Sequence, residues 1–497
     1  MSPSVQRMSS AERAAPPSAG RALSSAQQAA FAELLRVAPV AEALAERFVA
    51  AGHQLHLVGG SVRDALLGRL GDDLDFTTDA RPEQILRLVQ GWAQATWTTG
   101  IRFGTIGAQR NGLRLEITTY RSDSYDGTSR NPEVVFGDTL PGDLVRRDFT
   151  VNAMAVALPE RTFTDPYGGL SDLAQGVLRT PGAPEVSFGD DPLRMLRACR
   201  FAAQLGFTVD PAVELELTQM AEQISRISAE RVRDELSKLL CADVPRPGLE
   251  LLTDSGLAAY VLPELPAMRM EIDEHHQHKD VYQHSLTVLQ QAIDLEQADP
   301  DSAHPDLVLR LAALLHDVGK PRTRRKEAGG KVSFHHHEVV GAKMTRARLR
   351  TLRYPSDVIQ QVYQLVFLHL RFHGYGGGEW TDSAVRRYVT DAGDQVARLH
   401  KLVRSDSTTR NQRRAATLAA SYDSLEARIA VLREQEELSA IRPDLTGNDI
   451  MELLGIEPGP IVGQAYRFLY QLRLDRGPLP HDEAVAELRA WAAEHDL

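Results

Sequence analysis

Residues 55–78 read LHLVGGSVRDALLGRLGDDLDFTT, and this stretch predicts the centre of the first domain. An apolar run, a pair of glycines and a second run with helical spacing indicate a strand, a tight turn and a helix. The closing DLDFTT alternates polar and apolar residues, as a half-buried strand does. Alternate side chains of a strand point the same way, so Asp73 and Asp75 project from one face about 7 Å apart along the chain.

These two carboxylates repel each other unless a cation lies between them. Their arrangement suits a pair of Mg²⁺ ions roughly 4 Å apart, one activating an attacking hydroxyl and the other holding a triphosphate and its leaving group. Asp73 and Asp75 are therefore the candidate catalytic residues. Taken alone, the motif also fits a solvated acidic turn.

The glycine turn supplies a complementary site for an anion. Because Gly59 and Gly60 lack a Cβ, backbone N–H groups near Ser61 at the helix start can point at a phosphate. We expect Arg63 to add charge to this phosphate site and Asp64 to brace the turn. A phosphate-binding turn shortly before a carboxylate pair is typical of a nucleotidyl-transfer site, with a packed glycine turn as the alternative.

The composition is that of an ordinary globular protein: 497 residues, of which 43% are hydrophobic and 25% charged, enough for about three or four domains. No run approaches the roughly 20 apolar residues of a membrane span, so we expect no membrane contact. Cys199 and Cys241 are too few for a disulfide framework and suit a reducing, cytoplasmic location. The net charge of −11 confines nucleic-acid contacts to local basic patches.

The pattern along the chain changes near residue 160. Before it, short strand-like runs alternate with helical segments, and after it nearly every segment has helical periodicity. We predict an α+β fold class, with a small mixed sheet and helices in a head followed by an all-α neck and body. Residues 1–40 are rich in Ser, Ala and Pro and predict a disordered tail, with a mitochondrial transit peptide as a second interpretation.

Several ordered motifs carry a family resemblance. GGSVRD, DDLDF, LEITTYR and RRDFTVNAMA resemble the head domain of the class II tRNA nucleotidyltransferase and bacterial poly(A) polymerase family, within the polymerase-beta-like superfamily. DPYGGLSDL, DDPLRMLRACRFAAQLGF and SAERVRDELSKLL extend the resemblance over about residues 50–250. It implies a polymerase-beta-like head that adds nucleotides to RNA without a template.

The motif RRDFTVNAMA contains a candidate ribose site. Asp148 and Asn152 lie four residues apart and are predicted to share a helix face, with Arg147 at the helix start. The resemblance implies that this face contacts the ribose of the incoming nucleotide, and Asp and Asn can bond a hydroxyl. The alternative is a helix cap with a buried Asn.

The motif GDDPLRMLRACR suggests how the base is chosen. Asp191 and Arg194 are predicted to project together from a helix start. Cytosine and adenine each present an amino donor beside a ring-nitrogen acceptor, which this carboxylate and guanidinium match, whereas uracil and guanine reverse both groups. A surface ion pair is the alternative, and Asp190 stands where the family usually has Glu.

Further residues complete the candidate nucleotide site. Glu116 is a third carboxylate near the metals or an exposed strand residue. Arg121 and Arg130 are expected to face the triphosphate, and Arg197 joins the nucleotide-binding set. Asn131 replaces the family's usual His, so no role is assigned there.

The segment TGIRFGTIGAQ (Thr99–Gln109) bears on the branch of the family. Bacterial poly(A) polymerases typically carry a basic GRRFRL-like stretch here, so this chain resembles the CCA-adding branch. Poly(A), A-adding and CC-adding activities remain alternatives.

A second constellation lies downstream. HKDVYQHSL, LLHDVGKP and LVRSDSTTR offer His284, the adjacent His316 and Asp317, and Asp406. Imidazoles and carboxylates on helices are what a divalent-metal phosphohydrolase requires. The set resembles the all-α HD phosphohydrolase superfamily and implies hydrolysis of phosphomonoesters or 2′,3′-cyclic phosphates with Ni²⁺, Mn²⁺ or Zn²⁺. A structural remnant is the alternative.

Two more histidines are candidates for a second metal at this site. His337 in FHHHEVVG and His369 in VFLHLRFH fit that position, but the nearby His336 and His373 are rivals that the sequence does not separate.

Basic clusters predict where RNA binds. Lys343, Arg346, Arg350 and Arg353 repeat at helical spacing and form one basic stripe. PRTRRK (321–326) and RNQRR (410–414) add patches, and the segment 442–477 resembles the family's tail. Each cluster also fits a solvated helix face.

Together these observations predict an enzyme that adds CCA to tRNA 3′ ends from CTP and ATP by two-metal nucleotidyl transfer, with an HD hydrolase activity. The rivals are a poly(A) polymerase, an HD hydrolase with a nucleotide-binding head, and a silent RNA-binding protein. The expected segments are the tail 1–40, the head 41–160, the neck 161–270 for base and RNA binding, the HD-type domain 271–415 and an RNA-binding tail 416–497. The oligomeric state stays open.

Overall fold

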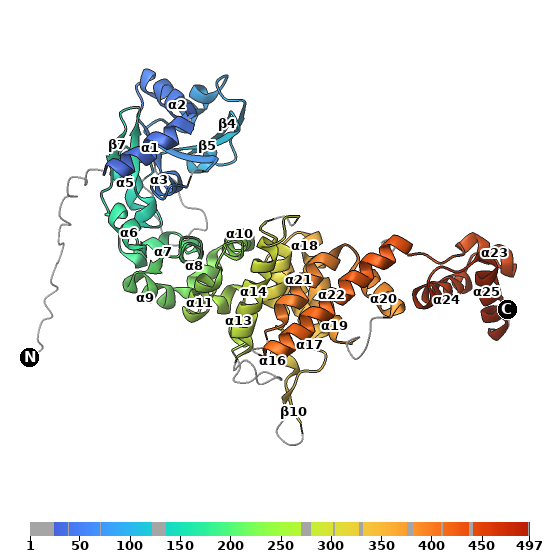
Figure 1. Ribbon diagram of the computed structural model, residues 1–497. Coiled ribbons are helices and arrows are strands. Elements are labelled where there is room, and N and C mark those ends of the chain that lie inside the picture. Colours follow the sequence, from blue (N-terminus) through green and yellow to red (C-terminus); the bar gives the residue numbers. More distant parts are fainter. Residues whose placement is uncertain are drawn as a thin grey trace, which may run out of the picture. The chain divides into compact units, whose positions relative to one another are not determined.

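The computed structural model describes residues 24–37, 39–69, 71–121, 136–269, 280–301, 304–327, 332–374, 381–408, 411–436, 441–495 and 497. The chain divides into two compact units, Met1–Ile227 and Ser228–Leu497, so the division falls inside the predicted neck. Figure 1 shows the helices and strands of both units. Within the described ranges, no helix combines the length and apolar character that a membrane span needs.

The first unit is built on a mixed sheet of seven strands in the order β3-β4-β5-β2-β1-β6-β7. The β2–β5 pair is parallel, and the other neighbouring pairs are antiparallel. The strands are β1 (Leu55–Val58), β2 (Asp73–Thr78), β3 (Ala95–Trp97), β4 (Thr105–Arg110), β5 (Leu113–Thr119), β6 (Ala155–Leu158) and β7 (Thr162–Thr164). The predicted mixed sheet is confirmed.

The first unit also contains helices. They are α1 (Ser25–Val37), α2 (Pro39–Ala50), α3 (Gly60–Leu66), α4 (Pro82–Val89), α5 (Leu140–Val145), α6 (Gly169–Gln175), α7 (Pro184–Asp190), α8 (Leu193–Leu205) and α9 (Pro211–Gln219). Short 3₁₀ turns cover Ile101–Phe103, Thr150–Asn152 and Ala221–Arg226, and β8 (Val177–Leu178) pairs with β9 (Thr208–Val209). Helix α4 packs on β4 and β5, and α2 packs on β1 and β6.

One local prediction needs correction. The predicted tail 1–40 includes the helix α1, whose Phe31, Leu34 and Leu35 are buried, because its apolar residues recur at helical spacing within the Ala-rich composition. Residues 122–135 lie outside the described residues, and Phe136 directly after them forms a single bridge with Arg121.

The second unit is almost entirely helical, as predicted for the body of the molecule (Figure 1). Its elements are α10 (Ala229–Leu240), α11 (Arg246–Asp254), α12 (Ala258–Val261), α13 (Glu264–Ala267), α14 (Val281–Gln297), α15 (Leu307–Leu315), α16 (Lys320–Thr323), α17 (His337–Thr351), α18 (Ser356–Leu368), α19 (Arg371–Gly374), α20 (Asp382–Ala392), a 3₁₀ turn (Gly393–Gln395), α21 (Val396–Asp406), α22 (Gln412–Gln435), α23 (Gly447–Leu454), α24 (Pro460–Arg476) and α25 (His481–Glu494), with the two-residue strands β10 (Arg325–Lys326) and β11 (Val332–Ser333).

Helix α15 packs against α10, α14, α18 and α21. Its sequence LVLRLAALL is apolar almost all round and buried along its length after Leu307, as expected of a helix that neighbours cover on every side. Its single charged residue, Arg310, is 2% exposed. The Arg310 guanidinium bonds both carboxylate oxygens of Glu296 at 3.0 and 2.9 Å and also donates to the carbonyls of Leu240 and Ala242. This network anchors α15, whose end carries the HD-type residues.

Candidate active sites

The turn between β1 and α3 requires glycine. Gly59 has φ +67°, and a Cβ there would lie 2.9 Å from Nη1 of Arg147. Arg147 is held beside the turn by a bond from Nη2 to Oδ2 of Asp143 at 3.1 Å. The turn therefore brings a guanidinium and the start of α3 to one place. Asp143 was missed in the sequence, although its position four residues before Arg147 is a usable signal.

The three candidate carboxylates lie on neighbouring strands. Asp75 of β2 stands opposite Glu116 of β5 in the parallel register, and Asp73 lies two residues earlier on the same strand. Burial raises the pKa of Asp75 to about 6, and the charges of Glu116 and Asp73 add to this rise while Arg147 opposes it. The structure thus brings together the carboxylates that the sequence proposed.

A cavity of about 280 Å³ opens at Asp73 and Asp75 and is also lined by Gly60, Ser61 and Asp64, among others. Leu34 of α1 also lines it. Carboxylate oxygens are the ligands that Mg²⁺ prefers. A group of carboxylates at one opening, with the pKa of Asp75 raised in part by its neighbours' charges, fits a divalent cation.

We expected Arg63 to face the phosphates, but its side chain contacts neighbouring protein groups. Its guanidinium donates to the Asp64 carboxylate at 2.9 and 2.8 Å and to Oδ1 of Asn152 at 2.6 Å. It also lies over the ring of Phe201, 5.1 Å from the centroid. In this arrangement Arg63 braces the turn together with Asp64.

Asp148, Asn152 and Arg197 form one buried network. Asn152 donates to Oδ1 of Asp148 at 2.9 Å, and Arg197 bonds Oδ2 at 2.7 Å. Burial opposes ionisation, yet Arg197 and the bond from Asn152 hold the pKa of Asp148 well below its usual range. The shared α-helix predicted here is wrong, because Thr150–Asn152 form only a 3₁₀ turn, but the two side chains still meet.

Asp191 and Arg194 do not leave one helix together. Asp191 has an extended backbone before Pro192, as residues preceding proline tend to have, and α8 begins only at Leu193. The Asp191 Oδ1 accepts the N–H of Leu193 at 3.1 Å. Arg194 donates to Oγ of Ser187 at 2.8 Å and to the carbonyl of Arg146 at 2.5 Å.

For Arg121, the structure gives a backbone contact, a 3.3 Å bond from its N–H to Oδ1 of Asp143. Arg130 and Asn131 lie outside the described residues.

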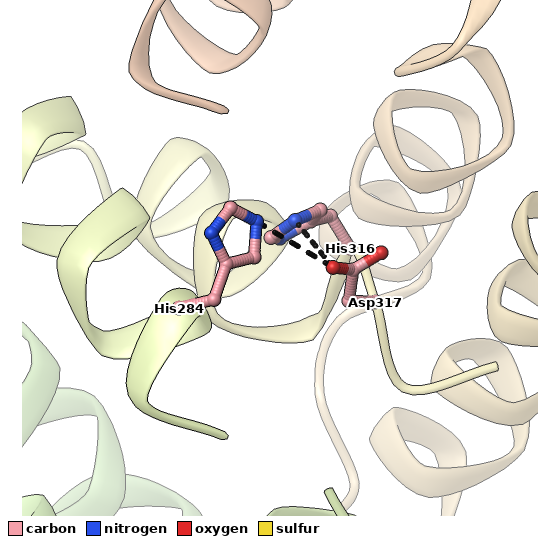
Figure 2. A group of neighbouring side chains, drawn as sticks. All are labelled: His284, His316 and Asp317. Atoms are coloured by element: carbon pink, nitrogen blue, oxygen red, sulfur yellow. Dashed lines mark ion pairs between the residues drawn. The ribbon is translucent and has the colours of Figure 1, made fainter. Parts of the chain in front are cut away.

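The second site gathers around Asp317. The Nε2 of His284 on α14 lies 3.6 Å from Asp317 Oδ2, and the Nε2 of His316 lies 3.2 Å from the same oxygen. Figure 2 shows both rings turned toward this carboxylate. Asp406, the last residue of α21, has its Oδ1 2.9 Å from His284 Nε2 and 3.5 Å from His316 Nε2.

Two further histidines, His337 and His369, form a second group with Asp317. His337 Nε2 lies 3.2 Å from Oδ1 of Asp317, and the His369 ring centroid is 5.3 Å from those of both His316 and His337. Ligand atoms within 4.8 Å of one another form two groups, His284–His316–Asp317 and Asp317–His337–His369. Asp317 belongs to both groups.

His336 lies apart from this cluster. Its side chain is 83% exposed and its Nδ1 is 3.8 Å from Glu338, whereas His337 is buried. The side chain of His373 lies outside the described residues.

The donor atoms of this second site are prepared for a metal. The Nδ1 atoms of His316, His337 and His369 lie 2.8, 2.9 and 2.7 Å from the carbonyls three residues earlier, so Nδ1 holds a proton and Nε2 is the atom that can bind a metal. The buried Nε2 of His369 has no hydrogen-bond partner among the described residues, whereas the Nε2 atoms of His316 and His337 each lie 3.2 Å from an oxygen of Asp317. Imidazole nitrogens directed at a shared carboxylate fit a divalent metal.

Lys320 also reaches this carboxylate and was missed in the sequence, although it closes the motif HDVGK. Its Nζ lies 2.9 Å from Oδ2 of Asp317, and it is 6% exposed. Gly319, which lies between Asp317 and Lys320 in the sequence, packs closely against α17. A Cβ on Gly319 would lie 2.1 Å from the carbonyl oxygen of His337. This close approach brings His337 to Asp317.

The predicted RNA-binding stripe on α17 is not uniform. Lys343 and Arg350 are exposed. The Arg346 guanidinium lies 3.5 Å from the ring centroid of Tyr363 and bonds Gln360. Arg353 follows α17 with φ +59°.

Family models match three consecutive parts of the chain. "Poly A polymerase head domain" matches residues 55–179, "Probable RNA and SrmB- binding site of polymerase A" matches residues 206–268, and "HD domain" matches residues 281–429.

Curated relatives agree with these matches. The A-adding tRNA nucleotidyltransferase of Deinococcus radiodurans is 34% identical over 448 residues, 88% of this chain and 95% of the relative. The CCA-adding enzymes of Levilactobacillus brevis and Bacillus subtilis are 42% and 41% identical, over 42% and 45% of this chain. The chain spans about half the length of these last two relatives, 52% and 54%.

Solved structures share the fold. The Bacillus stearothermophilus CCA-adding enzyme in complex with CTP has a TM-score of 0.65 and 25% identity, over 92% of this chain and 98% of that chain. The Thermotoga maritima CCA-adding enzyme complexed with tRNA has a TM-score of 0.58 and 20% identity, over 92% and 98%, and shows similarity of fold alone.

The sheet, the glycine turn and the carboxylates define a nucleotidyltransferase head, followed in the chain by an HD-type helical domain. The chain belongs to the tRNA nucleotidyltransferase family, since it matches the A-adding enzyme over nearly that relative's whole length. The family resemblance predicted from the sequence is confirmed.

Proposed function

We propose that this protein adds CCA to the 3′ ends of tRNA from CTP and ATP. The observation that carries the proposal is the meeting of Asp73, Asp75 and Glu116 beside the Gly59–Gly60 turn. The CCA-adding enzyme structures with CTP and with tRNA support the choice of substrates.

Each part of the head has a distinct task in this proposal. Asp73, Asp75 and Glu116 hold Mg²⁺, which when bound polarises the α-phosphate and activates the tRNA 3′-hydroxyl. The N–H groups after Gly59 bind the triphosphate, and Arg147 balances its charge. Pyrophosphate leaves when the new ester bond forms.

The Asp148 network receives the ribose. Because Arg197 and Asn152 keep Asp148 ionised, its carboxylate can accept a bond from a ribose hydroxyl. Asp191 and Arg194 select cytosine or adenine, which requires Arg194 to exchange its bonds with Ser187 and Arg146 for the base.

For the second unit we propose a metal-dependent phosphohydrolase acting on RNA 3′-phosphates or cyclic phosphates. Its support is the cluster of four histidines and Asp406 around Asp317. Imidazole ligands suit Ni²⁺ or Zn²⁺ more than Mg²⁺, and the two carboxylates also suit Mn²⁺. When bound, such a metal supplies a water activated for attack on phosphorus.

A second candidate function is addition of the terminal A alone. The observation that favours it is the relative matched over most of the chain, which is an A-adding enzyme. The Thr99–Gln109 segment still argues against a poly(A) polymerase.

One extension assay separates these activities. Purified protein and Mg²⁺ receive tRNA lacking CCA, or tRNA ending in CC, with CTP, ATP or both. Three added nucleotides support the proposal, a single A on the CC end alone supports the A-adding candidate, and long A tracts support a poly(A) polymerase.

Variants assign the two sites. Asp73→Ala is expected to reduce extension by more than about 100-fold while hydrolysis persists, because it removes a metal ligand. His316→Ala is expected to do the reverse. Glu83→Ala removes an exposed carboxylate of α4 that does not line this cavity, and it serves as the control. Normal extension by Asp73→Ala would overturn the assignment of the transferase site.

A further inference from the structure

Two basic segments that are separate in the sequence meet at one pocket in the second unit. Arg322, on α16 and within PRTRRK, and Lys343, on α17, both line a cavity of about 420 Å³. Glu264 of α13 forms another part of its wall. Ligand pockets of this size accommodate a nucleotide-sized molecule.

The pocket carries uncompensated positive charge. Arg348 also lines it, but the Arg348 Nε bonds both carboxylate oxygens of Glu264, at 3.0 and 2.9 Å, and this pair is neutral. Arg322 and Lys343 are exposed and have no side-chain partner among the described residues. In a chain of net charge −11, two unpaired cations facing one cavity favour an anionic ligand.

The remaining wall is largely apolar. Val340 and Met344 are half-buried on α17, and Ala347 follows one helical turn after Lys343. A flat, uncharged group can lie against this surface while an attached phosphate reaches the two cations. Unstacked RNA bases that pack on side chains combine contacts of this kind with phosphate contacts.

We propose that this pocket binds one nucleotide of the tRNA, with its phosphate between Arg322 and Lys343 and its base against Val340 and Met344. The inference rests on the proposed function for the choice of RNA. Glu264 lies inside the segment that matches an RNA-binding family model, residues 206–268, which favours RNA over a free nucleotide.

The test is equilibrium binding of full-length protein to tRNA lacking CCA between 50 and 200 mM salt. Arg322→Ala and Lys343→Ala are each expected to lower the slope of log K against log salt by about 1, the effect of losing one phosphate contact. Arg350→Ala removes an exposed cation of the same helix outside the pocket and is expected to change the slope by less. Equal loss in all three variants would show a diffuse basic surface and overturn the proposal.

Ala347→Trp fills the pocket without changing charge. Because Ala347 is exposed, the helix tolerates the larger side chain, which a normal circular dichroism spectrum and melting temperature would verify. This variant is expected to bind tRNA about 10-fold more weakly, and binding equal to that of the unchanged protein would overturn the proposal.

Free nucleotide is tested with CMP and AMP by calorimetry. Binding that is lost in Lys343→Ala would assign the pocket to free nucleotide and overturn the RNA assignment. If the unchanged protein extends no tRNA at all, the proposed function is wrong. The proposal that the pocket binds a tRNA nucleotide is decided by the binding measurements alone.

Discussion

The Oγ of Ser61 accepts the backbone N–H of Asp75 at 2.9 Å, joining the helix after the glycine turn to the strand of the carboxylates. The same hydroxyl donates to the carbonyl of Asp73 at 3.3 Å. β1 pairs with β2 only from Phe76 onward, so Ser61 takes the place of a strand partner beside Asp73 and Asp75. Its hydroxyl therefore positions the strand, although the sequence suggested only that its N–H faces a phosphate.

Replacing Ser61 should loosen the metal site. Ser61→Ala leaves the Asp75 N–H without its acceptor and is expected to weaken Mg²⁺ binding by about 10-fold, as loss of a supporting contact typically does. The measurement is Mn²⁺ binding by electron paramagnetic resonance together with the Mg²⁺ dependence of extension. Ser61→Thr keeps a hydroxyl and should recover part of the affinity. Unchanged metal affinity in Ser61→Ala would contradict this role.

Asp75 should make metal-free stability depend on pH. Its folded pKa of about 6 exceeds the ordinary value of 3.8, so between these values the folded state holds a proton that the unfolded state has lost. Stability should fall as pH rises through this window and stay low above pH 6. Asp75→Asn should therefore be more stable than the unchanged protein at pH 7.5, by at most about 3 kcal/mol, and equally stable near pH 3.5.

Urea unfolding in EDTA at the two pH values measures this difference. Asp72→Asn, which changes an exposed neighbour, should show little gain at either pH. A gain for Asp75→Asn that is the same at both pH values would point to a cause other than ionisation.

Metal loading of the HD-type site should release protons. Burial alone would lower the pKa of His316, but the carboxylates of Asp317 and Asp406 raise it to about 10. A metal ligand must present an unprotonated Nε2, so binding at pH 8 should release about one proton from His316. Calorimetry with Mn²⁺ or Ni²⁺ in two buffers of different ionisation enthalpy measures it.

Two histidine variants provide the controls for this experiment. His316→Ala should abolish the release along with tight binding, whereas His336→Ala, on an exposed neighbour of His337, should leave it unchanged. Binding with no proton release in the unchanged protein would show that His316 is neutral before the metal arrives.

The contact between Gly319 and α17 should tolerate no side chain. A Cβ on Gly319 would lie 2.1 Å from the His337 carbonyl, so Gly319→Ala should separate His337 from Asp317 and cost about 1–3 kcal/mol of stability, the usual cost of overpacking. Gly463 lies on α24 with open space at its Cβ position. Gly463→Ala should therefore be neutral or stabilising by up to about 1 kcal/mol.

Thermal unfolding measures the stability of both glycine variants, and Mn²⁺ binding measures whether the metal site is intact. Equal stability of Gly319→Ala and the unchanged protein would mean that α16 and α17 can move apart without loss.

The sequence predicted those features that depend on local pattern. Strand alternation placed Asp73 and Asp75 on one face, and Gly59 marked the turn. The HD-type residues were found through a family motif, since His284 lies on α14, Asp317 in the turn after α15 and Asp406 at the end of α21, and no local period links them.

Side-chain partners were harder to predict. Arg63 was expected at a phosphate but bonds Asn152, and Arg194 was expected beside Asp191 but bonds Ser187. Guanidinium groups reach many acceptors, and which one they meet depends on strands and helices that only the fold brings together. The α1 helix was hidden by an Ala-rich composition that also suits disorder.

Two of the HD-type histidines also end helices. His316 follows α15 and His369 follows α18, and each ring bonds a carbonyl in the last turn that no helical N–H can satisfy. The proton that completes the helix thus sits on Nδ1 and turns Nε2 toward the centre. This rigid coupling predicts that chelation empties the centre without disordering its rings, so that a stripped enzyme regains metal once His316 has lost its second proton, with no refolding step.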